Sequence, residues 1–369
     1  MRLAQYLIVE PHRYDAPVAD PPAINAVDIT RRFGSTTAVD GASVRVERGQ
    51  LVALLGPSGS GKTTLLRTIA GFEVPDAGTV EIGGRLVAGP GVWVEPEHRK
   101  VGMVFQDGAL FPHLTAGRNV RFGNPRPGRA EECLELVGLA HRADSYPHEL
   151  SGGERQRIAL ARALATDPEV VLLDEPFASL DAALRTSLRE EVAAILRAAG
   201  ASALLVTHDQ QEALSLADSV VLLRDGRVEQ VGTPEQVYAE PANRWVAEFL
   251  GAVDVLPGEA RGGVVTCELG CFDDQAVADG PVDVLLRPES IAVGDPAAPP
   301  PPGAPGHGRE ARATVVARSF YGADQLIRLE LDSGRRVSSR RPGFARWQVG
   351  DRVCVWVEGP VKALAAGPR

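Results

Sequence analysis

Residues 51–71 read LVALLGPSGSGKTTLLRTIAG, and the fold of the chain follows from this stretch. An apolar run typical of a strand comes first, a glycine-rich loop follows, and the stretch ends with helical periodicity. The order strand, G-x-x-x-x-G-K-[ST], helix predicts a phosphate-binding loop, because backbone N–H groups and a helix N-terminus then face phosphate oxygens. We expect Lys62 to reach the β- and γ-phosphates of a nucleotide and the Thr63 hydroxyl to bind Mg²⁺.

The predicted loop is continuous in sequence. Its nucleotide-binding residues are Gly56, Pro57, Ser58, Gly59, Ser60, Gly61, Lys62, Thr63 and Thr64. A glycine-rich turn with a chance lysine is the alternative, but such a turn would not need a strand before it and a helix after it. The flanking segments therefore favour nucleotide binding.

An acidic pair follows a second apolar run, EVVLLDEP at residues 169–176. Ligands of open α/β sheets lie at the carboxyl ends of the strands, so we expect Asp174 and Glu175 near the phosphates. Asp174 is suited to hold Mg²⁺, through water ligands, because hard cations prefer oxygen. Glu175 would face the attacking water as general base. Such a pair also occurs as a loop or helix cap, and the phosphate loop favours the catalytic interpretation.

Bulk properties limit the classes of function. The chain has 369 residues, enough for two domains, and its 44% hydrophobic and 24% charged residues are typical of a globular protein. A net charge of -9 argues against an extended surface for nucleic acid. No segment has the run of about 18 apolar residues that a membrane helix needs, so we expect any membrane association to come from partners.

The sequence pattern divides the chain into three parts. Residues 1–22 end in DAPVADPP and are expected to form a flexible tail. Residues 23–250 alternate helical segments with short apolar runs, AINAVDI, LVALLG and VVLLDEP among them; LVALL and VVLLD are typical of strands buried on both faces of a mostly parallel sheet. Residues 251–369 show alternating patterns such as DQLIRLEL and DRVCVWVEG, which predict a small all-β barrel or sandwich.

Another motif separates the classes of nucleotide-binding protein. ELSGGERQRIALARAL, at residues 149–164, lies between the phosphate loop and the acidic pair and resembles the signature motif of ABC-type ATPases. Ser151 and Glu154 have the S-x-x-E spacing of a capping box, which opens a helix whose N-terminus can receive an anion. Gly152 and Gly153 allow close backbone approach. The motif argues against a P-loop kinase or GTPase.

Four further residues resemble marks of the same family. Gln106 in GMVFQDGALFPHL resembles the glutamine that links the Mg²⁺ and water region to a segment in contact with membrane subunits. Asp181 in ASLDAALR resembles an aspartate at the dimer seam, and His208 in LLVTHDQQEAL resembles the histidine that hydrogen-bonds the γ-phosphate. Phe33 in TRRFGSTTAVD resembles the aromatic residue that stacks on adenine; packing of its ring in the core is the alternative.

The resemblance implies a mechanism and a set of partners. Two copies of the chain would meet head to tail, with ATP held between the phosphate loop of one copy and the LSGGE of the other, and with ATP and Mg²⁺ as cofactors. Two transmembrane permease subunits would contact the dimer, a solute-binding protein would act indirectly, and nucleic acid would not be a partner. The chain would then lie peripherally on the cytoplasmic face of the cell membrane.

The fold implied by the resemblance is an α/β P-loop NTPase cassette, with a mostly parallel sheet and with antiparallel β and helical subdomains. LLRPESIAV and SFYGADQLIRLEL resemble the OB-like (TOBE) domain of importer ATPases, so a small all-β OB-like domain is expected after the cassette. FQDGALFPHLT and FLGAVDVLPGE favour the iron(III) importer group. Polyamine, thiamine, sulfate and sugar importers remain alternatives, as does a soluble ABC ATPase without a role in transport.

Overall fold

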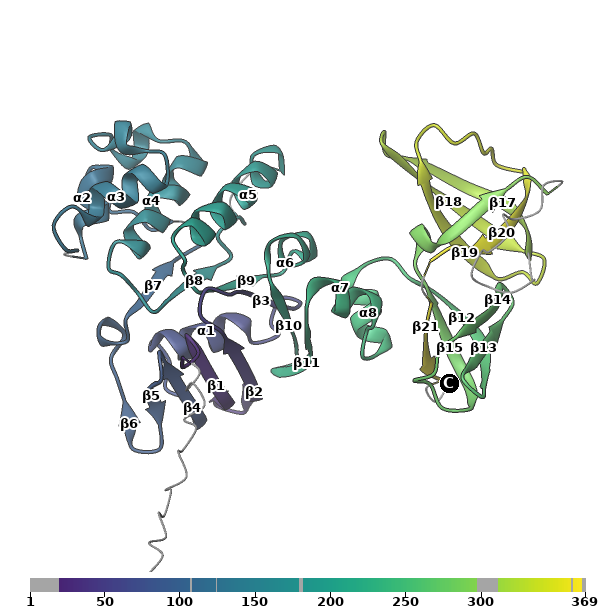
Figure 1. Ribbon diagram of the computed structural model, residues 1–369, viewed down its shortest axis with the longest axis horizontal. Helices are drawn as coiled ribbons and strands as arrows, with labels where there is room; N and C mark the ends of the chain where they lie inside the picture. The colour runs from purple at the N-terminus through teal and green to yellow at the C-terminus, as the bar shows by residue number, and fades with distance from the viewer. Residues whose placement is uncertain are drawn as a thin grey trace, which may run out of the picture.

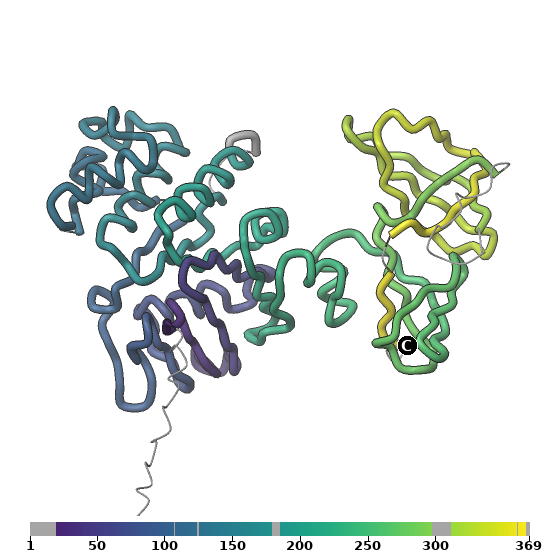
Figure 2. The backbone as a smooth tube through the Cα atoms, in the orientation of Figure 1, coloured from purple at the N-terminus to yellow at the C-terminus, as the bar shows by residue number. Residues whose placement is uncertain are grey.

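The computed structural model describes residues 20–106, 108–123, 125–178, 182–296, 311–359 and 361–366, with only the backbone of 182–184. An α/β cassette extends to Leu250, and a β domain begins at Asp254 (Figure 1). Figure 2 shows the chain crossing from the cassette to the β domain through the segment between these two residues. No helix within the described ranges is both long and apolar enough to cross a bilayer.

A six-stranded sheet forms the centre of the cassette. In spatial order its strands are β11 (Arg227–Gly232), β10 (Ser219–Arg224), β3 (Leu51–Leu55), β9 (Ala203–Thr207), β8 (Val170–Asp174) and β7 (Val101–Val104). Neighbouring strands are parallel except at the edge, where β11 is antiparallel to β10. The mostly parallel sheet expected from the sequence is therefore confirmed.

The inner strands of this sheet are buried on both faces. Along β3, Val52 and Leu54 belong to the core shared with helix α1 (Lys62–Ala70), whereas Ala53 and Leu55 belong to the core on the opposite face. Burying an aliphatic side chain contributes about 2 kcal/mol, so a run that is apolar at every position is stabilised from both sides. The interpretation of LVALL as a strand buried on both faces is confirmed.

A second, antiparallel sheet packs against α1. In spatial order its strands are β2 (Thr36–Val46), β1 (Ile24–Phe33), β4 (Ala77–Ile82), β5 (Arg85–Gly89) and β6 (Val92–Trp93). All but the first residue of the run AINAVDI lies in β1, so the run belongs to this sheet rather than to the parallel one. Only alternate residues of its first part, Ile24 and Ala26, face the core, because the sheet packs on one face.

Helices cover both faces of the parallel sheet. Besides α1, the helices of the cassette are α2 (Ala116–Arg121), α3 (Arg129–Leu136), α4 (Gly152–Leu164), α5 (Ala182–Ala198), α6 (Gln210–Leu216), α7 (Pro234–Ala239) and α8 (Arg244–Leu250), with the short 3-10 helices η1 (Pro96–His98), η2 (Ala140–Arg142) and η3 (Pro147–Glu149). The 3-10 helix η4 (Pro288–Ser290) belongs to the β domain. Helices α2, α3 and α4 lie together at one end of the cassette (Figure 1). Side-chain N-caps begin several helices, because each supplies an acceptor for a first-turn N–H: Thr115, Ser151, Asp209, Thr233 and Asn243.

The β domain consists of two five-stranded sheets that share one core. One sheet has the order β14 (Gly270–Asp273), β13 (Val264–Cys267), β12 (Asp254–Arg261), β15 (Gly280–Leu286), β21 (Lys362–Ala365). The other has the order β16 (Ile291–Gly294), β20 (Arg352–Val357), β17 (Ala311–Phe320), β18 (Asp324–Leu331), β19 (Arg336–Pro342). The predicted all-β, OB-like fold is confirmed; most of the proline-rich segment 295–308 lies outside the described residues.

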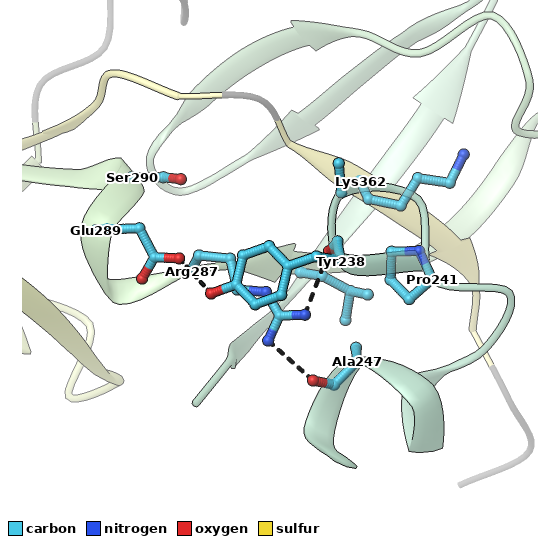
Figure 3. A pocket seen from close by; sticks show the side chains of 9 residues that line it. Tyr238, Pro241, Ala247, Arg287, Glu289, Ser290 and Lys362 are labelled. Atoms are coloured by element: carbon cyan, nitrogen blue, oxygen red, sulfur yellow. Dashed lines mark hydrogen bonds between the residues drawn. The ribbon is translucent and has the colours of Figure 1, made fainter. Parts of the chain in front are cut away.

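Arg287, from the segment LLRPESIAV, fastens the β domain to the cassette. Its Nη1 donates to the carbonyl oxygens of Ala247 at 2.8 Å and Gly251 at 3.1 Å, and its Nη2 donates to that of Tyr238 at 3.3 Å. The guanidinium carbon also lies 4.1 Å from the centroid of the Tyr238 ring, whose hydroxyl donates to Glu289 (Figure 3). A pocket of about 170 Å³ is lined by residues that include Tyr238, Ala247, Arg287 and Glu289. Burial lowers the pKa of Arg287 and raises that of Tyr238 to about 12.

Arg287→Ala is expected to loosen the β domain without unfolding it. The variant loses hydrogen bonds from a charged donor, each contributing about 1.5–3 kcal/mol, while the β domain keeps its own core. Proteinase K should then cleave between Leu250 and Asp254 about tenfold faster or more, because opening of this junction becomes more frequent. Arg261→Ala is the control, since the Arg261 side chain is 83% exposed and pairs within its own strand. Equal cleavage of both variants would contradict the prediction.

Candidate active site

Three segments leave the parallel sheet at the carboxyl ends of neighbouring strands. Leu55, which ends β3, lies opposite Thr207, which ends β9. Asp174, which ends β8, pairs with the residue before Thr207. The glycine-rich loop, Glu175 and His208 therefore follow directly from three adjacent strands. In open α/β sheets, ligands bind at the carboxyl ends of the strands.

The loop 56–61 is packed so closely that both of its ends require glycine. A Cβ atom on Gly56 would lie 2.1 Å from the carbonyl oxygen of Leu223. A Cβ atom on Gly61 would lie 2.2 Å from the carbonyl oxygen of Ala38, and Gly61 also has a φ of 99°. Any larger residue at either position would push the loop away from its neighbours.

Lys62 lies on the inner side of this loop. Its Nζ donates to the carbonyl oxygens of Gly56 at 2.9 Å and Pro57 at 2.8 Å, and the residue is 4% exposed. Burial lowers the pKa of Lys62, and the negative charges of Glu175 and Asp174 oppose this effect. Helix α1 begins here without a side-chain cap, so its first-turn N–H groups and its dipole face whatever the loop encloses.

The side chains of Asp174 and Thr63 are hydrogen-bonded to each other. Burial raises the pKa of Asp174, and the charge of Glu175 adds to this effect. The charge of Arg67, a hydrogen bond with Thr63 and the charge of Lys62 act in the opposite direction. A carboxylate and a hydroxyl in contact form an all-oxygen donor set, which is the type that Mg²⁺ prefers.

Glu175 and His208 contact each other across the strand ends. The His208 Nδ1 and the Glu175 Oε2 are 3.0 Å apart. Glu175 has a φ of 44°, in the left-handed region that side chains other than those of glycine, asparagine and aspartate seldom adopt. Backbone strain of this kind amounts to about 1–3 kcal/mol and clusters at functional sites. The Glu175 side chain is 22% exposed and that of His208 is 53% exposed, so both can meet a ligand.

Ser151 and Glu154 form the capping box that the sequence predicts. The Ser151 Oγ accepts a hydrogen bond from the Glu154 N–H at 3.2 Å, and the Glu154 carboxylate accepts one from the Ser151 N–H at 2.8 Å. These hydrogen bonds lower the pKa of Glu154. Gly152 and Gly153 form the first turn of α4, which lies with α2 and α3 and apart from α1 (Figure 1). Among the described residues, no hydrogen bond or ion pair joins this box to the phosphate loop.

Gln106 is placed near the site by its backbone. Its carbonyl oxygen accepts a hydrogen bond from the Gln156 Nε2 at 3.1 Å, and the same amide donates to the carbonyl of Pro176 at 2.7 Å. Within the described part of the chain, no hydrogen bond joins the Gln106 side chain to Thr63 or Asp174. Gln156 is not among the residues predicted from the sequence, although it lies in ELSGGERQRIALARAL. Its buried amide joins the segment after β7 to the segment after β8.

Phe33 and Asp181 complete the predicted residues. Phe33 is 46% exposed, so its ring does not pack in the core, and the guanidinium of Arg31 lies 4.6 Å from the ring centroid. This exposure leaves the ring accessible to a ligand. Asp181 lies outside the described residues.

The loop and its surroundings fit a phosphate chain with a divalent cation. Ser58, Gly59 and Thr63 are exposed, so the loop is open on one side. The Ser60 Oγ is buried and has no hydrogen-bond partner in the described structure, and Lys62 is bound to carbonyls that phosphate oxygens can replace. An unpaired buried hydroxyl next to a buried ammonium group is satisfied by an anion.

Comparisons with known proteins place these features in a family. The ABC transporter family model matches residues 39–178, and the TOBE domain model matches residues 284–359. An Fe(3+) ions import ATP-binding protein of Rhodococcus jostii is 46% identical to this chain, over 93% of this chain and 98% of that protein. A sulfate/thiosulfate import ATP-binding protein of Chromobacterium violaceum is 45% identical, over 82% of this chain and 82% of that protein.

A solved structure gives the same result for the cassette. CbiO1 from Clostridium perfringens, part of the ABC transporter complex CbiONQ, superposes with a TM-score of 0.54 at 26% identity and covers 60% of this chain and 92% of its own. The family match on the cassette includes the phosphate loop, the signature motif and the acidic pair. The chain therefore belongs to the ABC transporter family and is one of its ATP-hydrolysing subunits, with a nucleotide-binding cassette followed by a TOBE domain.

Proposed function

We propose that this chain supplies the energy for iron(III) import, as a homodimer that contacts two permease subunits at the cytoplasmic face of the membrane. The observation that carries the proposal is the similarity to an Fe(3+) import relative across both cassette and β domain, over 93% of this chain. A binding protein that captures the solute would act through the permease and not through this chain.

Each site residue has a proposed role in hydrolysis. Mg²⁺, when bound, supplies positive charge beside the β- and γ-phosphate oxygens. Thr63 would provide an oxygen ligand to the cation, Asp174 would hold it through water ligands, and Lys62 would bind the β- and γ-phosphates. Glu175 accepts a proton from the attacking water. His208, which lies 3.0 Å from Glu175, donates a hydrogen bond to the γ-phosphate and holds the Glu175 carboxylate in place.

A second copy of the chain is proposed to complete each site. The exposed N-terminus of α4, opened by Ser151, would present its N–H groups to the γ-phosphate held by the opposite copy. Gln106 would respond to the cation and the water, Asp181 would lie at the seam between copies, and Phe33 would stack on adenine. Contacts with the γ-phosphate exist only before hydrolysis, so ATP favours the closed dimer and hydrolysis removes that bias.

A partly apolar pocket beside the site is the proposed contact for the permease. The rings of Phe72 and Phe105 have centroids 6.4 Å apart, and both residues line a pocket of about 210 Å³ together with Met103 and Asp174. Phe72 is 48% exposed and Phe105 is 39% exposed, and exposed aromatic groups of this kind mark interaction surfaces. Asp174 lines this pocket and is also part of the active site. A partner bound in the pocket would therefore lie next to the site of ATP hydrolysis.

Deletion of the gene for this chain is expected to remove most of the uptake of radiolabelled Fe(III) by cells grown under iron limitation, because transport has lost its ATPase. Sulfate is the second candidate solute, since the sulfate/thiosulfate import relative is 45% identical. Uptake of radiolabelled sulfate in the same cells should therefore be measured in parallel. We expect it to stay at the wild-type level.

Complementation provides the control for this experiment. The wild-type gene should restore Fe(III) uptake, and a gene encoding Glu175→Gln should not, because the variant keeps the fold but lacks the general base. Loss of sulfate uptake with normal Fe(III) uptake would reject iron and favour sulfate. Normal uptake of both solutes in the deletion strain would reject both candidates.

A further inference from the structure

A buried ion network holds the residues on both sides of His208. Arg189, on α5, donates from Nη2 to the Asp209 Oδ2 at 2.6 Å and to the Glu212 Oε1 at 2.8 Å. The other carboxylate oxygen of Glu212 accepts a hydrogen bond from the Thr207 hydroxyl. Thr207 and Asp209 are the chain neighbours of His208, so one guanidinium group holds this turn from both ends.

Most of the residues in this network are buried, which restricts how they can rearrange. Arg189 is 7% exposed, Glu212 4% and Thr207 2%. Asp209 also accepts hydrogen bonds from the first-turn N–H groups of α6, and its own N–H donates to the Thr207 Oγ1 at 3.0 Å. Removing Arg189 would leave the buried carboxylate of Glu212 without its ionic partner, so the arrangement has little freedom to change.

The His208 ring itself is held by fewer contacts than the residues on either side of it. It is about half exposed, and its contact across the site is with Glu175 at 3.0 Å. His208 lies in the connection between β9 and α6 and belongs to neither element. The direction of the ring therefore depends on the backbone of the turn, and the buried network determines that backbone.

We propose that Arg189 is a positioning residue for ATP hydrolysis, which holds the turn at residues 207–209 so that the His208 ring meets Glu175 and the γ-phosphate. The proposal rests on the role of His208 in the proposed function. Helices α5 and α6 lie side by side (Figure 1), and Arg189 carries this contact into the turn. Arg185 on the same helix is farther from Asp209, at 3.9 Å.

Arg189→Met tests the proposal, because methionine keeps much of the length of the side chain without the guanidinium. In the full-length protein we expect kcat for ATP to fall about tenfold or more, since displacing a catalytic group by about 1 Å lowers rates up to about 10²-fold. KM for ATP should change less than about twofold, because Lys62 and the phosphate loop are untouched. Arg189→Lys, which keeps the charge, should recover part of the rate.

A second variant separates positioning from folding. The double variant combines Arg189→Met with Glu212→Gln. It leaves no unpaired buried carboxylate at residue 212, so it should fold even if Arg189→Met alone does not. The same fall in kcat is expected. In NMR spectra, the imidazole resonances of His208 should shift in both variants, because the ring has changed its surroundings.

Arg197→Met is the matched control on the same helix. Arg197 also joins α5 to α6, by donating to the carbonyl of Leu216 at 3.1 Å, but it lies at the far end of α5 from Arg189 and its side chain is 58% exposed. If α5 mattered only for general packing, both variants would lower kcat alike. We expect Arg197→Met to keep the wild-type kcat and the wild-type His208 resonances.

The possible outcomes separate the role of Arg189 from that of His208. A low rate in His208→Ala together with a wild-type kcat in folded Arg189→Met would overturn the role of Arg189 alone. An equal loss in Arg189→Met and Arg197→Met would overturn it as well. A wild-type kcat in His208→Ala would instead reject the proposed role of His208, and the role of Arg189 with it. In the expected case, Arg189→Met adds no further loss to His208→Ala.

Discussion

Glu175→Gln is expected to lower the rate of ATP hydrolysis about 10²- to 10⁴-fold and to trap a dimer with ATP bound. Glutamine has nearly the same shape as glutamate, so the contact with His208 at 3.0 Å can persist, but its amide cannot accept a proton from water. Binding through Lys62 and the loop is unaffected. The dimer therefore closes on ATP and cannot reopen through hydrolysis. Phosphate release and size-exclusion chromatography with Mg²⁺ and ATP measure the two effects.

Glu169→Gln is the matched control for this variant. Glu169 directly precedes β8, at the opposite end from Glu175, and pairs with Arg48 at 3.0 Å. The control should hydrolyse ATP at the wild-type rate and show no trapped dimer. Phosphate release near the wild-type rate in Glu175→Gln would argue against its role as general base. If Glu175→Gln eluted only as a monomer in the presence of ATP, this would argue against an ATP site shared between two copies of the chain.

Lys62→Ala is expected to lower kcat about 10²- to 10³-fold, as is found when one preorganised donor to transition-state charge is removed. It should also weaken ATP binding by roughly 2 kcal/mol, or about 30-fold in Kd, because a charged donor to the phosphates is lost. Unlike Glu175→Gln, this variant should not form the trapped dimer. Titration with a fluorescent ATP analogue measures Kd, and phosphate release measures kcat.

Lys100→Ala serves as the control for the loss of a lysine. The Lys100 side chain is 72% exposed, and its Nζ lies 3.9 Å from Glu169 in a surface ion pair that contributes little. Its Kd and kcat should match those of the wild type. If Lys62→Ala bound ATP as tightly as Lys100→Ala, the ammonium group would not be part of the nucleotide site.

The parts of the fold that could be predicted are those specified by neighbouring residues. LVALL indicates a strand buried on both faces, and β3 has this property because side chains alternate between two cores along it. The spacing of Ser151 and Glu154 predicts a capping box, and both hydrogen bonds are present, since a helix start depends on residues within one turn. The roles of these and the other site residues in hydrolysis remain predictions.

Other features could not be predicted because they depend on residues that are distant in the chain. AINAVDI is a short, largely apolar run, yet it belongs to the antiparallel sheet, since the choice of sheet depends on β2 and β4 as partners. Nothing near Arg287 in sequence indicates that it meets Tyr238 and Ala247 of the cassette.

Short sequence motifs therefore indicate the chemistry of this chain, whereas the contacts between its site residues depend on the tertiary structure. The nine-residue motif from Gly56 to Thr64 predicts phosphate binding by itself, because glycine conformations and a helix N-terminus are local properties. The contact of Glu175 with His208, and the hold of Arg189 on the turn beside it, arise only when separate strands and helices pack together. Long-range burial selects such contacts, and local propensity does not encode them.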